Sequence, residues 1–487
     1  MANFGNSREE KMKKALCVVF ALLISANFAS AQTYVLGLWG LHSTFGVDQY
    51  YNFNQSVTNA RSMGMGGVYY AFDNQSSGSF LNPAGMIFTK KPLLNLDLFT
   101  SLDKHEGAPI PLYTPDFYDP NTGYDFYSNI SDIDNKHSRF DQAGAAAPFY
   151  QFGREWWVGG GFRTVLDLHS EYNMQSYIEG QGARFTEHRG IDAINFALAT
   201  EIIPQFGFGV NFNIYVRGYE QDFFYPQNYI DDYGDTLAYN IHLKDKSNFS
   251  GVNFDFGGVY DLDIVRIGAL VSTGYTLKQN SLFKQAQLNE YGEDVGAIDR
   301  VEMKNHFPMT YGGGIAFVPM DNFSVGLDFT MRPYSKVRID VNPEQNLFVD
   351  TTGYDPGWED LKQLRAGAEY IFNAGFGKIP LRVGLQNIPD LFSAGNITQT
   401  LDTVTVGGQL QEIYEYNRES GDQFNTYLYT FGTGLQLEKI WFDAAYQYGT
   451  SSYDQSRIID FYGDVTTFDR SVKYKYSRFF FSVGMLF

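Results

Sequence analysis

The last nine residues of the chain, FFFSVGMLF at positions 479–487, decide the fold. Apolar side chains occupy every second position from Phe479 to Phe487, while Ser482 and Gly484 lie between them. Successive side chains of a β-strand point to opposite faces, so this alternation predicts a strand with one apolar face and one mixed face. The terminal Phe487 is typical of the signal read by the machinery that inserts barrels into the outer membrane. The stretch therefore indicates a sheet embedded in lipid.

The same alternation recurs along the chain, for example over 206–217 and 323–332. It predicts an even number of strands, fourteen, each long enough to cross a bilayer at a tilt. The sequence thus predicts an all-β fold, a 14-stranded antiparallel transmembrane β-barrel. The expected strands are 92–104, 140–151, 155–168, 188–202, 205–219, 249–261, 264–279, 307–318, 321–333, 361–373, 378–388, 424–437, 440–450 and 474–487.

The connections between these segments alternate between short and long. Short ones are expected at 152–154, 203–204, 262–263, 319–320, 374–377 and 438–439, and long ones at 109–134, 220–246 and 389–422. Short turns belong on the periplasmic side of such a barrel and long loops outside. A soluble β-propeller or β-sandwich, the alternative, has no reason to sort its loops in this way.

The N-terminus is expected to be a secretory signal peptide, residues 1–31. A basic cluster with Lys13 and Lys14 precedes an apolar run over 15–24, and Ala29-Ser30-Ala31 is a cleavage site of small residues. Met12 starts a compact leader by itself, so Met1 and Met12 both remain candidate starts. The only cysteine, Cys17, lies in this leader, which excludes disulfides and thiolate chemistry from the mature chain.

The composition fits a membrane barrel. Aromatic residues make up 17% of the chain, with 35 Tyr, 43 Phe and 49 Gly. After the leader, no run of 18 apolar residues could form a transmembrane helix. The formal net charge of -19 argues against nucleic-acid binding and predicts solvated loops facing lipopolysaccharide bridged by divalent cations.

A barrel of fourteen strands leaves a lumen that must be filled to prevent leakage. Residues 32–91 precede the first strand, are rich in Gly, Asn and Ser, and lack sustained alternation. They are expected to form a plug, or hatch, inside the barrel of residues 92–487.

Two short motifs lie in this expected plug. The first is ARSMGMGG at 60–67, with Gly64, Gly66 and Gly67, and the second is Asn82-Pro83-Ala84-Gly85. Together with VPMDNFSVGLDF at 318–329, LRAGAEYIF at 364–372 and LRVGLQNIP at 381–389, they resemble the outer-membrane long-chain fatty acid transporter (FadL/TodX) family. The resemblance implies a fourteen-stranded barrel with an N-terminal hatch that moves to open a passage. The alternative is that Gly64, Gly66, Gly67, Asn82, Pro83 and Ala84 only shape the plug.

The resemblance also implies a kinked third strand, which leaves a lateral opening for a hydrophobic ligand. The triplet Gly159-Gly160-Gly161 is the candidate kink, since glycines weaken a ladder and favour bulges. Alternatively, the triplet makes room for bulky plug residues.

Charged residues fall on the expected lumen face, where they must pair with one another, the plug or water. Interior salt bridges that hold the plug are one interpretation. The other is that an arginine, with Arg163, Arg217 and Arg332 as candidates, receives the carboxylate of a ligand. The set is Arg163, Arg217, Asp255, Arg266, Asp328, Arg332, Arg365, Glu369, Arg382, Asp443 and Arg478.

Catalytic and metal chemistry is not expected. The seven histidines have no zinc-ligand spacing, and no Ser and His pair occupies adjacent strands as a barrel phospholipase would need. Acidic loop clusters such as Asp231, Asp232 and Asp235 match no calcium-loop pattern and are expected to be solvated. Neither a cofactor nor enzyme activity is predicted.

The leading hypothesis is an outer-membrane channel for passive uptake of hydrophobic compounds, either long-chain fatty acids or aromatic hydrocarbons. The ligand would use a lumenal pocket and a hatch or lateral opening. The alternative is a barrel whose tyrosine-rich outer loops, such as 223–239, dock a protein partner in secretion across the outer membrane. A hydrophilic porin is the third hypothesis.

Overall fold

The computed structural model describes residues 59–72, 81–106, 110–111, 127–128, 132–175, 182–230, 236–287, 298–343, 351–393, 397–406, 409–418, 422–461 and 464–487. The expected signal peptide and much of the expected plug, at 32–58 and 73–80, lie outside the described residues. Among the described residues, no helix combines the length and apolarity needed to cross a membrane.

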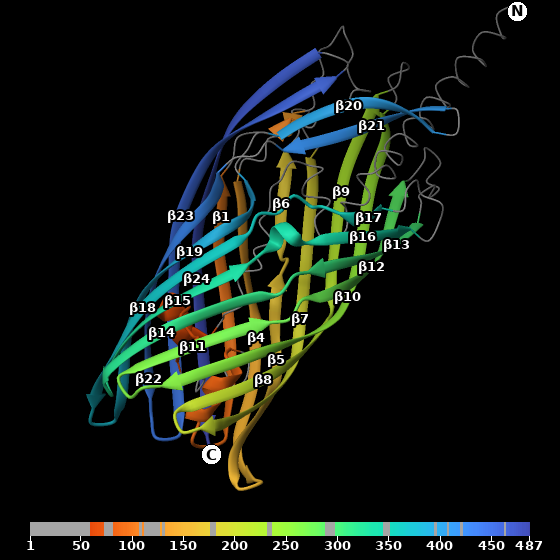
Figure 1. Ribbon diagram of the computed structural model, residues 1–487. Coiled ribbons are helices and arrows are strands. Elements are labelled where there is room, and N and C mark those ends of the chain that lie inside the picture. The colour runs from red at the N-terminus through yellow and green to blue at the C-terminus, as the bar shows by residue number, and fades with distance from the viewer. Residues whose placement is uncertain are drawn as a thin grey trace, which may run out of the picture.

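Fourteen antiparallel strands close into a barrel (Figure 1), which confirms the predicted fold class. The last strand pairs with the first, from Leu93 opposite Leu486 to Glu106 opposite Lys473, and this pairing closes the barrel. The spanning strands are β1 (Leu93–Glu106), β4 (Asp132–Gln151), β5 (Arg154–Asp167), β7 (Gly182–Ile203), β8 (Phe206–Val216), β10 (Thr236–Asp261), β11 (Val265–Ser272), β14 (Thr310–Met320), β15 (Phe323–Arg332), β18 (Leu361–Ala374), β19 (Gly377–Ser393), β22 (Gln423–Gln436), β23 (Ile440–Phe461) and β24 (Asp464–Leu486).

Further strands extend the wall on the long-loop side. They are β6 (Ser170–Gln175), β9 (Gly218–Ile230), β12 (Tyr275–Gln287), β13 (Ile298–Phe307), β16 (Arg338–Pro343), β17 (Thr351–Tyr354), β20 (Ile397–Val406) and β21 (Gln409–Arg418), with the short pair β2 (Ile110–Pro111) and β3 (Tyr127–Ser128). The helical turns among the described residues are α3 (Ala60–Gly64), η1 (Pro83–Phe88) and η3 (Tyr334–Lys336). The expected loops at 220–246 and 389–422 are therefore largely strands, because neighbouring hairpins continue to pair outside the membrane.

The short connections lie where the sequence predicts them. Phe152, Gln205 and Asp263 each adopt a left-handed backbone in such a turn, with φ of 55°, 73° and 66°. Figure 1 shows the tight turns at the same end of the barrel as the C-terminus. The predicted alternation of short and long connections is confirmed for the described strands.

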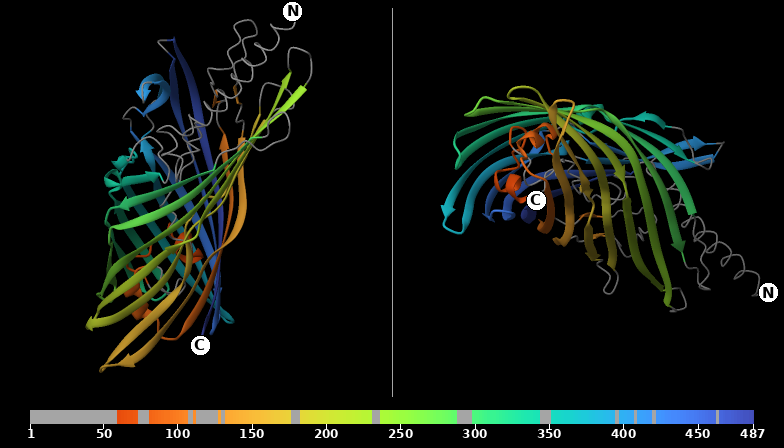
Figure 2. Two further views of the ribbon diagram at one scale, coloured as in Figure 1. Left: turned by 90° about the vertical axis from the view of Figure 1, so that its right-hand side faces the viewer. Right: turned by 90° about the horizontal axis from the view of Figure 1, so that it is seen from below.

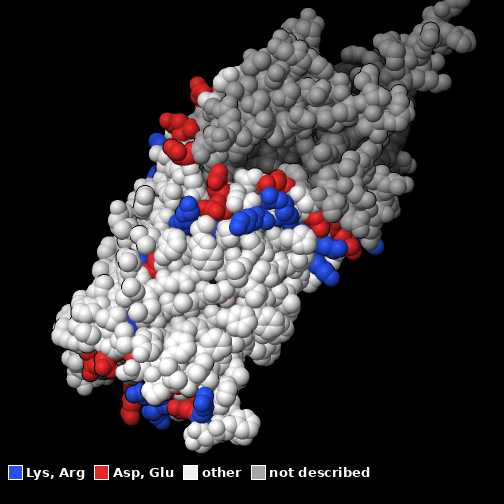
Figure 3. Space-filling view, in the orientation of Figure 1, with Lys and Arg blue, Asp and Glu red and all other residues white. Residues whose placement is uncertain are grey.

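Apolar side chains lie on the outer face of the barrel and polar side chains on the inner face, the reverse of the arrangement in a soluble protein. Leu98, Leu327 and Phe431 on the outer face are 50%, 51% and 56% exposed, whereas Asp328 and Arg365 on the inner face are buried. Exposed apolar residues in a continuous belt are stable only against lipid. Figure 3 shows this uncharged belt, with acidic and basic residues gathered at its two edges.

Half of the wall is interrupted along one line. The strands β5, β8, β11, β14 and β15 end at this line, and β6, β9, β12, β13 and β16 continue beyond it. We call the line the crease; it comprises 168–169, 217, 273–274, 308–309 and 333–337. Pro308 and Pro333 cannot donate to a ladder, and Arg217 has a φ of 73°. Outward-facing ion pairs above the crease, such as Lys246 with Glu220 at 3.0 Å, place that part of the wall outside the lipid.

Candidate functional site in the barrel lumen

The described residues before the first strand, 59–72 and 81–91, lie inside the barrel, and we call them the plug segment. Figure 2 shows them within the curve of the strands. Asn59 caps α3 by accepting a hydrogen bond from the Ser62 amide at 2.7 Å. The Ala60 amide donates to Ser482 Oγ of the last strand at 2.8 Å. Ser482 alternates with the exposed Phe481, so this contact lies on the inner face.

The three motif glycines allow close packing of the plug segment against the wall. A Cβ on Gly64 would lie 2.9 Å from the Gly432 Cα in β22, and one on Gly66 would lie 2.5 Å from the Ala366 carbonyl oxygen. Gly66 and Gly67 also have φ of 71° and 82°, which side chains rarely adopt. The geometry accounts for shaping of the plug; opening of the plug stays a prediction.

Asn82, Pro83 and Ala84 connect the two parts of the plug segment to the wall. The buried Asn82 side chain accepts from the Ala84 amide at 3.1 Å and donates to the Tyr70 and Gly258 carbonyls at 2.7 and 3.2 Å. Pro83 begins η1, where its missing N–H costs nothing. In this protein the Asn-Pro-Ala motif therefore holds the two parts of the plug segment together and binds them to β10.

Buried charges link the plug segment to three strands. Arg61 Nη2 lies 2.9 Å from Glu369 Oε1 of β18, and Arg382 Nε of β19 donates to Glu369 Oε2 at 2.6 Å. Arg382 Nη1 also donates to Asp443 Oδ1 of β23 at 2.6 Å. These contacts form the interior salt-bridge ladder that the sequence offered as one interpretation of its lumenal charges. The ladder's plug partner, Arg61, lies within the glycine motif, where the sequence indicated no ionic role for it.

Asp328 of β15 anchors the end of the first part of the plug segment. Its Oδ2 accepts from the Tyr69 and Tyr70 amides at 2.6 and 3.1 Å. The Tyr70 hydroxyl contacts Thr330 Oγ1 at 2.8 Å. Each interaction satisfies a buried polar group that would otherwise be costly.

The triplet Gly159-Gly160-Gly161 lies in an unbroken part of β5. All three residues keep regular pairing with β4 and β7. Gly159 pairs with Ala146 and Ala197, which belong to the apolar cluster around the buried Met86 of η1. Both interpretations of the triplet, a kink and room for bulky plug residues, stay predictions. The third strand is instead irregular between Thr164 and Leu166 and ends at Asp167.

The wall has an unpaired seam at this irregularity. Pairing between β4 and β5 runs only as far as Gln142 opposite Arg163. Beyond it, residues 132–141 of β4 pair with β1 and residues 164–175 pair with β7, and no strand pairing joins the two segments among the described residues. We call these two segments the seam. The strand pairing of the barrel wall is therefore interrupted at the seam.

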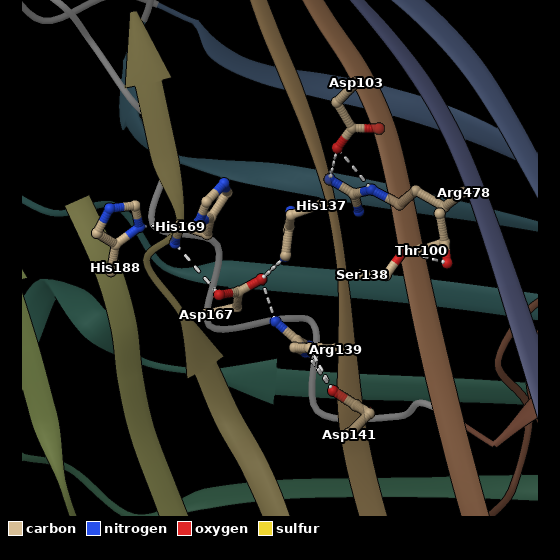
Figure 4. A network of polar contacts seen from close by, with 10 residues as sticks. All are labelled: Thr100, Asp103, His137, Ser138, Arg139, Asp141, Asp167, His169, His188 and Arg478. Carbon is tan, nitrogen blue, oxygen red and sulfur yellow. Dashed lines mark hydrogen bonds and ion pairs between the residues drawn. The ribbon is translucent and has the colours of Figure 1, made fainter. Parts of the chain in front are cut away.

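Polar side chains fill the seam (Figure 4). His137 Nε2 and Arg139 of β4 both contact the Asp167 carboxylate at the end of β5. Arg139 Nε also donates to Asp141 Oδ1 at 2.6 Å, and the His169 amide donates to Asp167 Oδ1 at 3.2 Å. Between the two segments of the seam, these side-chain contacts take the place of backbone pairing.

The histidines of the seam continue onto β7. The rings of His137 and His169 are 4.4 Å apart, and His169 Nδ1 lies 3.3 Å from His188 Nδ1. These histidines are scattered in the sequence, which therefore does not predict the cluster. They come together only because β5 ends before His169. No group of three metal-binding side chains occurs among the described residues.

A large apolar cluster lines the inner wall at the crease, and we call it the apolar band. Tyr215 and Leu361 share strand faces with Asn211 and Arg365, which contact the plug segment, so the band faces the lumen. Aromatic rings connect it: Tyr215 and Tyr275 are 4.9 Å apart, and Tyr275 and Phe307 are 5.0 Å apart. Its buried members are Leu166, Leu168, Ile191, Ala193, Tyr215, Tyr219, Phe249, Leu277, Met303, Phe307, Tyr334, Val337, Ile339, Trp358, Leu361 and Leu391.

The three candidate arginines have different positions. Arg332 is buried at the crease end of β15, where its Nη1 lies 3.5 Å from Gln363 Oε1. Arg163 is partly buried in β5 at the lower end of the seam. Arg217 is not a buried lumen residue as expected: its side chain is 52% exposed and pairs with Asp192 at 2.7 Å. The correction follows from its left-handed φ, which breaks the alternation of β8.

The sequence did not predict the apolar band. Most of its members, including Met303, Trp358 and Leu391, lie in segments that the sequence predicts as loops or strand ends. The available signal was the clustering of Tyr, Phe and Trp near strand ends, which the sequence assigned to interface girdles.

No family model matches the sequence, and the curated proteins include no significant match to it. Solved structures do match. A FadL homologue of Pseudomonas aeruginosa is 14% identical, with a TM-score of 0.58 over 90% of this chain and 100% of that chain. The toluene transporter TodX of Pseudomonas putida is 11% identical, with a TM-score of 0.54 over 89% and 99%.

The CymD monoaromatic hydrocarbon channel is 13% identical to this chain, with a TM-score of 0.50 over 89% of this chain and 99% of that one. These likenesses span nearly the whole of each neighbour. At such identities they establish the architecture alone. The protein is a membrane β-barrel with the fold of the FadL and TodX channels.

Proposed function

We propose that this protein is a bacterial outer-membrane channel for passive uptake of hydrophobic compounds. The observation that carries the proposal is the apolar band, a buried aromatic and aliphatic surface inside a barrel whose short-turn end holds the plug segment. Burial of hydrocarbon contributes about 0.8 kcal/mol per CH₂, so a long chain or a ring system can bind there without energy coupling. The solved FadL homologue and the TodX and CymD channels with the same fold support it.

The proposed route has three parts. A compound enters from the outer end, binds along the apolar band and leaves through the seam or past the plug segment. The seam adjoins the band, since Leu166 and Leu168 of the band flank Asp167 in sequence. The tight contacts of Gly64 and Gly66 with the wall argue that sideways exit needs less rearrangement than removal of the plug segment.

Lipid and lipopolysaccharide are the proposed surroundings of the barrel. The uncharged belt meets charged side chains above the crease, among them Lys244, Lys278 and Lys304. Cations at this height face the phosphates of the outer leaflet. This distribution of charges fits a barrel inserted with its long connections outward.

The test is binding and uptake. Purified protein reconstituted in nanodiscs should change the fluorescence of a fluorescent fatty acid or an aromatic dye in a saturable manner. Deletion of its gene should slow growth on hydrophobic carbon sources. Absence of both effects across several ligand classes would remove the support for a channel. Saturable conductance of sugars or ions in planar bilayers would instead indicate a hydrophilic porin.

A further inference from the structure

Polar side chains adjoin the apolar band on the inner wall, on the long-connection side of the crease. Gln221 follows the band residue Tyr219 by two positions, Gln279 follows Leu277 by two, and Asn305 lies between Met303 and Phe307. We call this group the acceptor belt. Its buried members are Glu187 of β7, Gln221 of β9, Asp245 and Ser247 of β10, Gln279 and Ser281 of β12, and Asn305 of β13.

The amide donors of the acceptor belt are already used, either within the belt or, for Asn305 Nδ2, on the Leu277 carbonyl of the apolar band. Gln221 Nε2 donates to Glu187 Oε1 at 2.8 Å, and the Tyr219 hydroxyl donates to Asp245 Oδ2 at 3.0 Å. Gln279 Nε2 lies 3.2 Å from Ser247 Oγ and 3.1 Å from Ser281 Oγ. Rotating the Gln221 amide would place its oxygen against a carboxylate, so the orientation is determined by its neighbour.

Three amide oxygens of the belt are buried without a donor from any described residue. They are Gln221 Oε1, Gln279 Oε1 and Asn305 Oδ1, on three strands of the same inner wall. A buried acceptor left unpaired costs roughly 1–3 kcal/mol. Three such oxygens on one inner wall indicate a surface that is completed by hydrogen-bond donors from another molecule.

The ionisable side chains of the acceptor belt are all acidic. Glu187 and Asp245 are its ionisable members, and the cations of the same strands, such as Lys246, Lys278 and Lys304, are exposed on the opposite face. A carboxylate head group would meet carboxylates and amide oxygens here in a desolvated setting, which is unfavourable. A hydroxyl or an ammonium group would meet acceptors.

We propose that the acceptor belt binds the polar end of an amphiphilic ligand whose hydrocarbon lies on the apolar band, and that this end is a hydrogen-bond donor, a hydroxyl or a protonated amine, and not a carboxylate. The inference rests on the proposed function and names the substrate class of the same lumenal site. It assigns to Gln221, Gln279 and Asn305 the selection of the head group. It disfavours the reading in which a fatty acid carboxylate anchors the ligand at an arginine.

The test compares four ligands with the same chain length: hexadecanol, hexadecylamine, hexadecanoic acid and hexadecane. Each competes with diphenylhexatriene for the full chain in nanodiscs at pH 8, with empty nanodiscs as the partition reference. Two recovered hydrogen bonds of about 1 kcal/mol each predict that the alcohol and the amine compete at least about tenfold better than the acid.

A matched pair of variants assigns the preference to the belt. Gln279→Leu removes an inward acceptor, and Asn280→Leu changes the adjacent residue on the exposed face. We expect Q279L to lose most of the preference for hexadecanol over hexadecane, while N280L keeps it. Heat-dependent migration on gels checks that both barrels are folded, and Asn305→Leu provides a second inward variant if Q279L does not fold.

The outcomes distinguish a failure of head-group recognition from a failure of the proposed channel function. Competition by hexadecanoic acid equal to or better than hexadecanol overturns the head-group inference and leaves the channel standing. Failure of all four ligands, hexadecane included, overturns the proposed function and this inference with it. An unchanged preference in both Q279L and N305L removes the acceptor belt from head-group recognition.

Discussion

Gly64 of the plug segment and Gly432 of β22 pack backbone against backbone: a Cβ on Gly64 would lie 2.9 Å from the Gly432 Cα, and a Cβ on Gly432 would lie 2.8 Å from the Gly64 Cα. Neither position tolerates a methyl group without a shift of the backbone. The Thr430 hydroxyl reinforces the contact by donating to the Gly64 carbonyl at 3.1 Å. The plug segment therefore depends on a glycine in the wall as much as on its own.

Gly432→Ala should loosen the plug segment. Overpacking of this kind costs roughly 1–3 kcal/mol, and the added methyl pushes α3 away from β22. We expect a lower urea midpoint in detergent and a higher leak conductance in planar bilayers. Gly375→Ala, in a turn with open space around its Cβ position, is the matched control and should change neither quantity. Equal behaviour of both variants would mean that α3 does not press against β22.

Arg382→Met should lower the free energy of unfolding more than Gly432→Ala does. The change removes the cation that pairs with Asp443 and leaves Glu369 with Arg61, and uncompensated buried charge costs about 3–5 kcal/mol. Chemical unfolding in detergent measures the loss. Lys378→Met, an exposed position in the same strand, serves as the control. A loss of less than about 1 kcal/mol in R382M would show that water enters and solvates these carboxylates.

Modification of the seam should slow transport. The sequence has one cysteine, Cys17, within the expected leader, so a single introduced cysteine can be labelled selectively. A bulky maleimide on His169→Cys should reduce uptake of a hydrophobic dye by reconstituted protein, because His169 lies between β5 and β6. The same label on Thr100→Cys, where β1 is paired on both sides, should leave uptake unchanged. Full uptake with labelled H169C would direct the exit past the plug segment instead.

The acceptor belt predicts a pH dependence of stability. Asp245 lies in the part of β10 above the crease, outside the lipid. Burial raises the pKa of its carboxyl from an ordinary value near 4 to about 7. Hydrogen bonds from Tyr219 and Ser247 lower this pKa, but burial outweighs them. Glu187 adds to the rise. Between these values the folded state binds a proton that the unfolded state does not, so the free energy of unfolding falls as pH rises from about 4 to about 7.

Asp245→Asn should flatten this slope, because the amide does not titrate. Asp222→Asn, at an exposed outward position paired with Lys244, should preserve it. Urea midpoints across the pH range give both slopes. A slope that persists in D245N would assign the titration to other groups.

The strands within the membrane could be predicted closely from the sequence. The expected strand 361–373 is observed as Leu361–Ala374, and 155–168 as Arg154–Asp167. Lipid outside and polar contacts inside impose a strict alternation, and sequence reports alternation directly. Residues of the glycine motif were also recognisable, since close backbone packing requires glycine whatever the surroundings.

The upper wall and the seam could not be predicted in the same way. Outside the lipid, both faces of a strand carry polar residues, so the sequence predicts a loop where β9 and the start of β10 are observed. A single left-handed residue, Arg217, ends the alternation of β8, and any residue type can occupy such a position at a cost that sequence does not reveal. His137 and His169 meet only because pairing between β4 and β5 stops at Arg163, a consequence of the whole barrel.

The central claim is that a hydrophobic ligand occupies the lumen against the apolar band, above the plug segment. A density map of the protein purified from its native membrane, without added ligand, tests it most directly. The account predicts elongated or planar density beside Tyr215, Phe307 and Trp358, with residues 59–72 inside the bore. A band covered by the protein's own side chains, or a plug segment outside the bore, would contradict it.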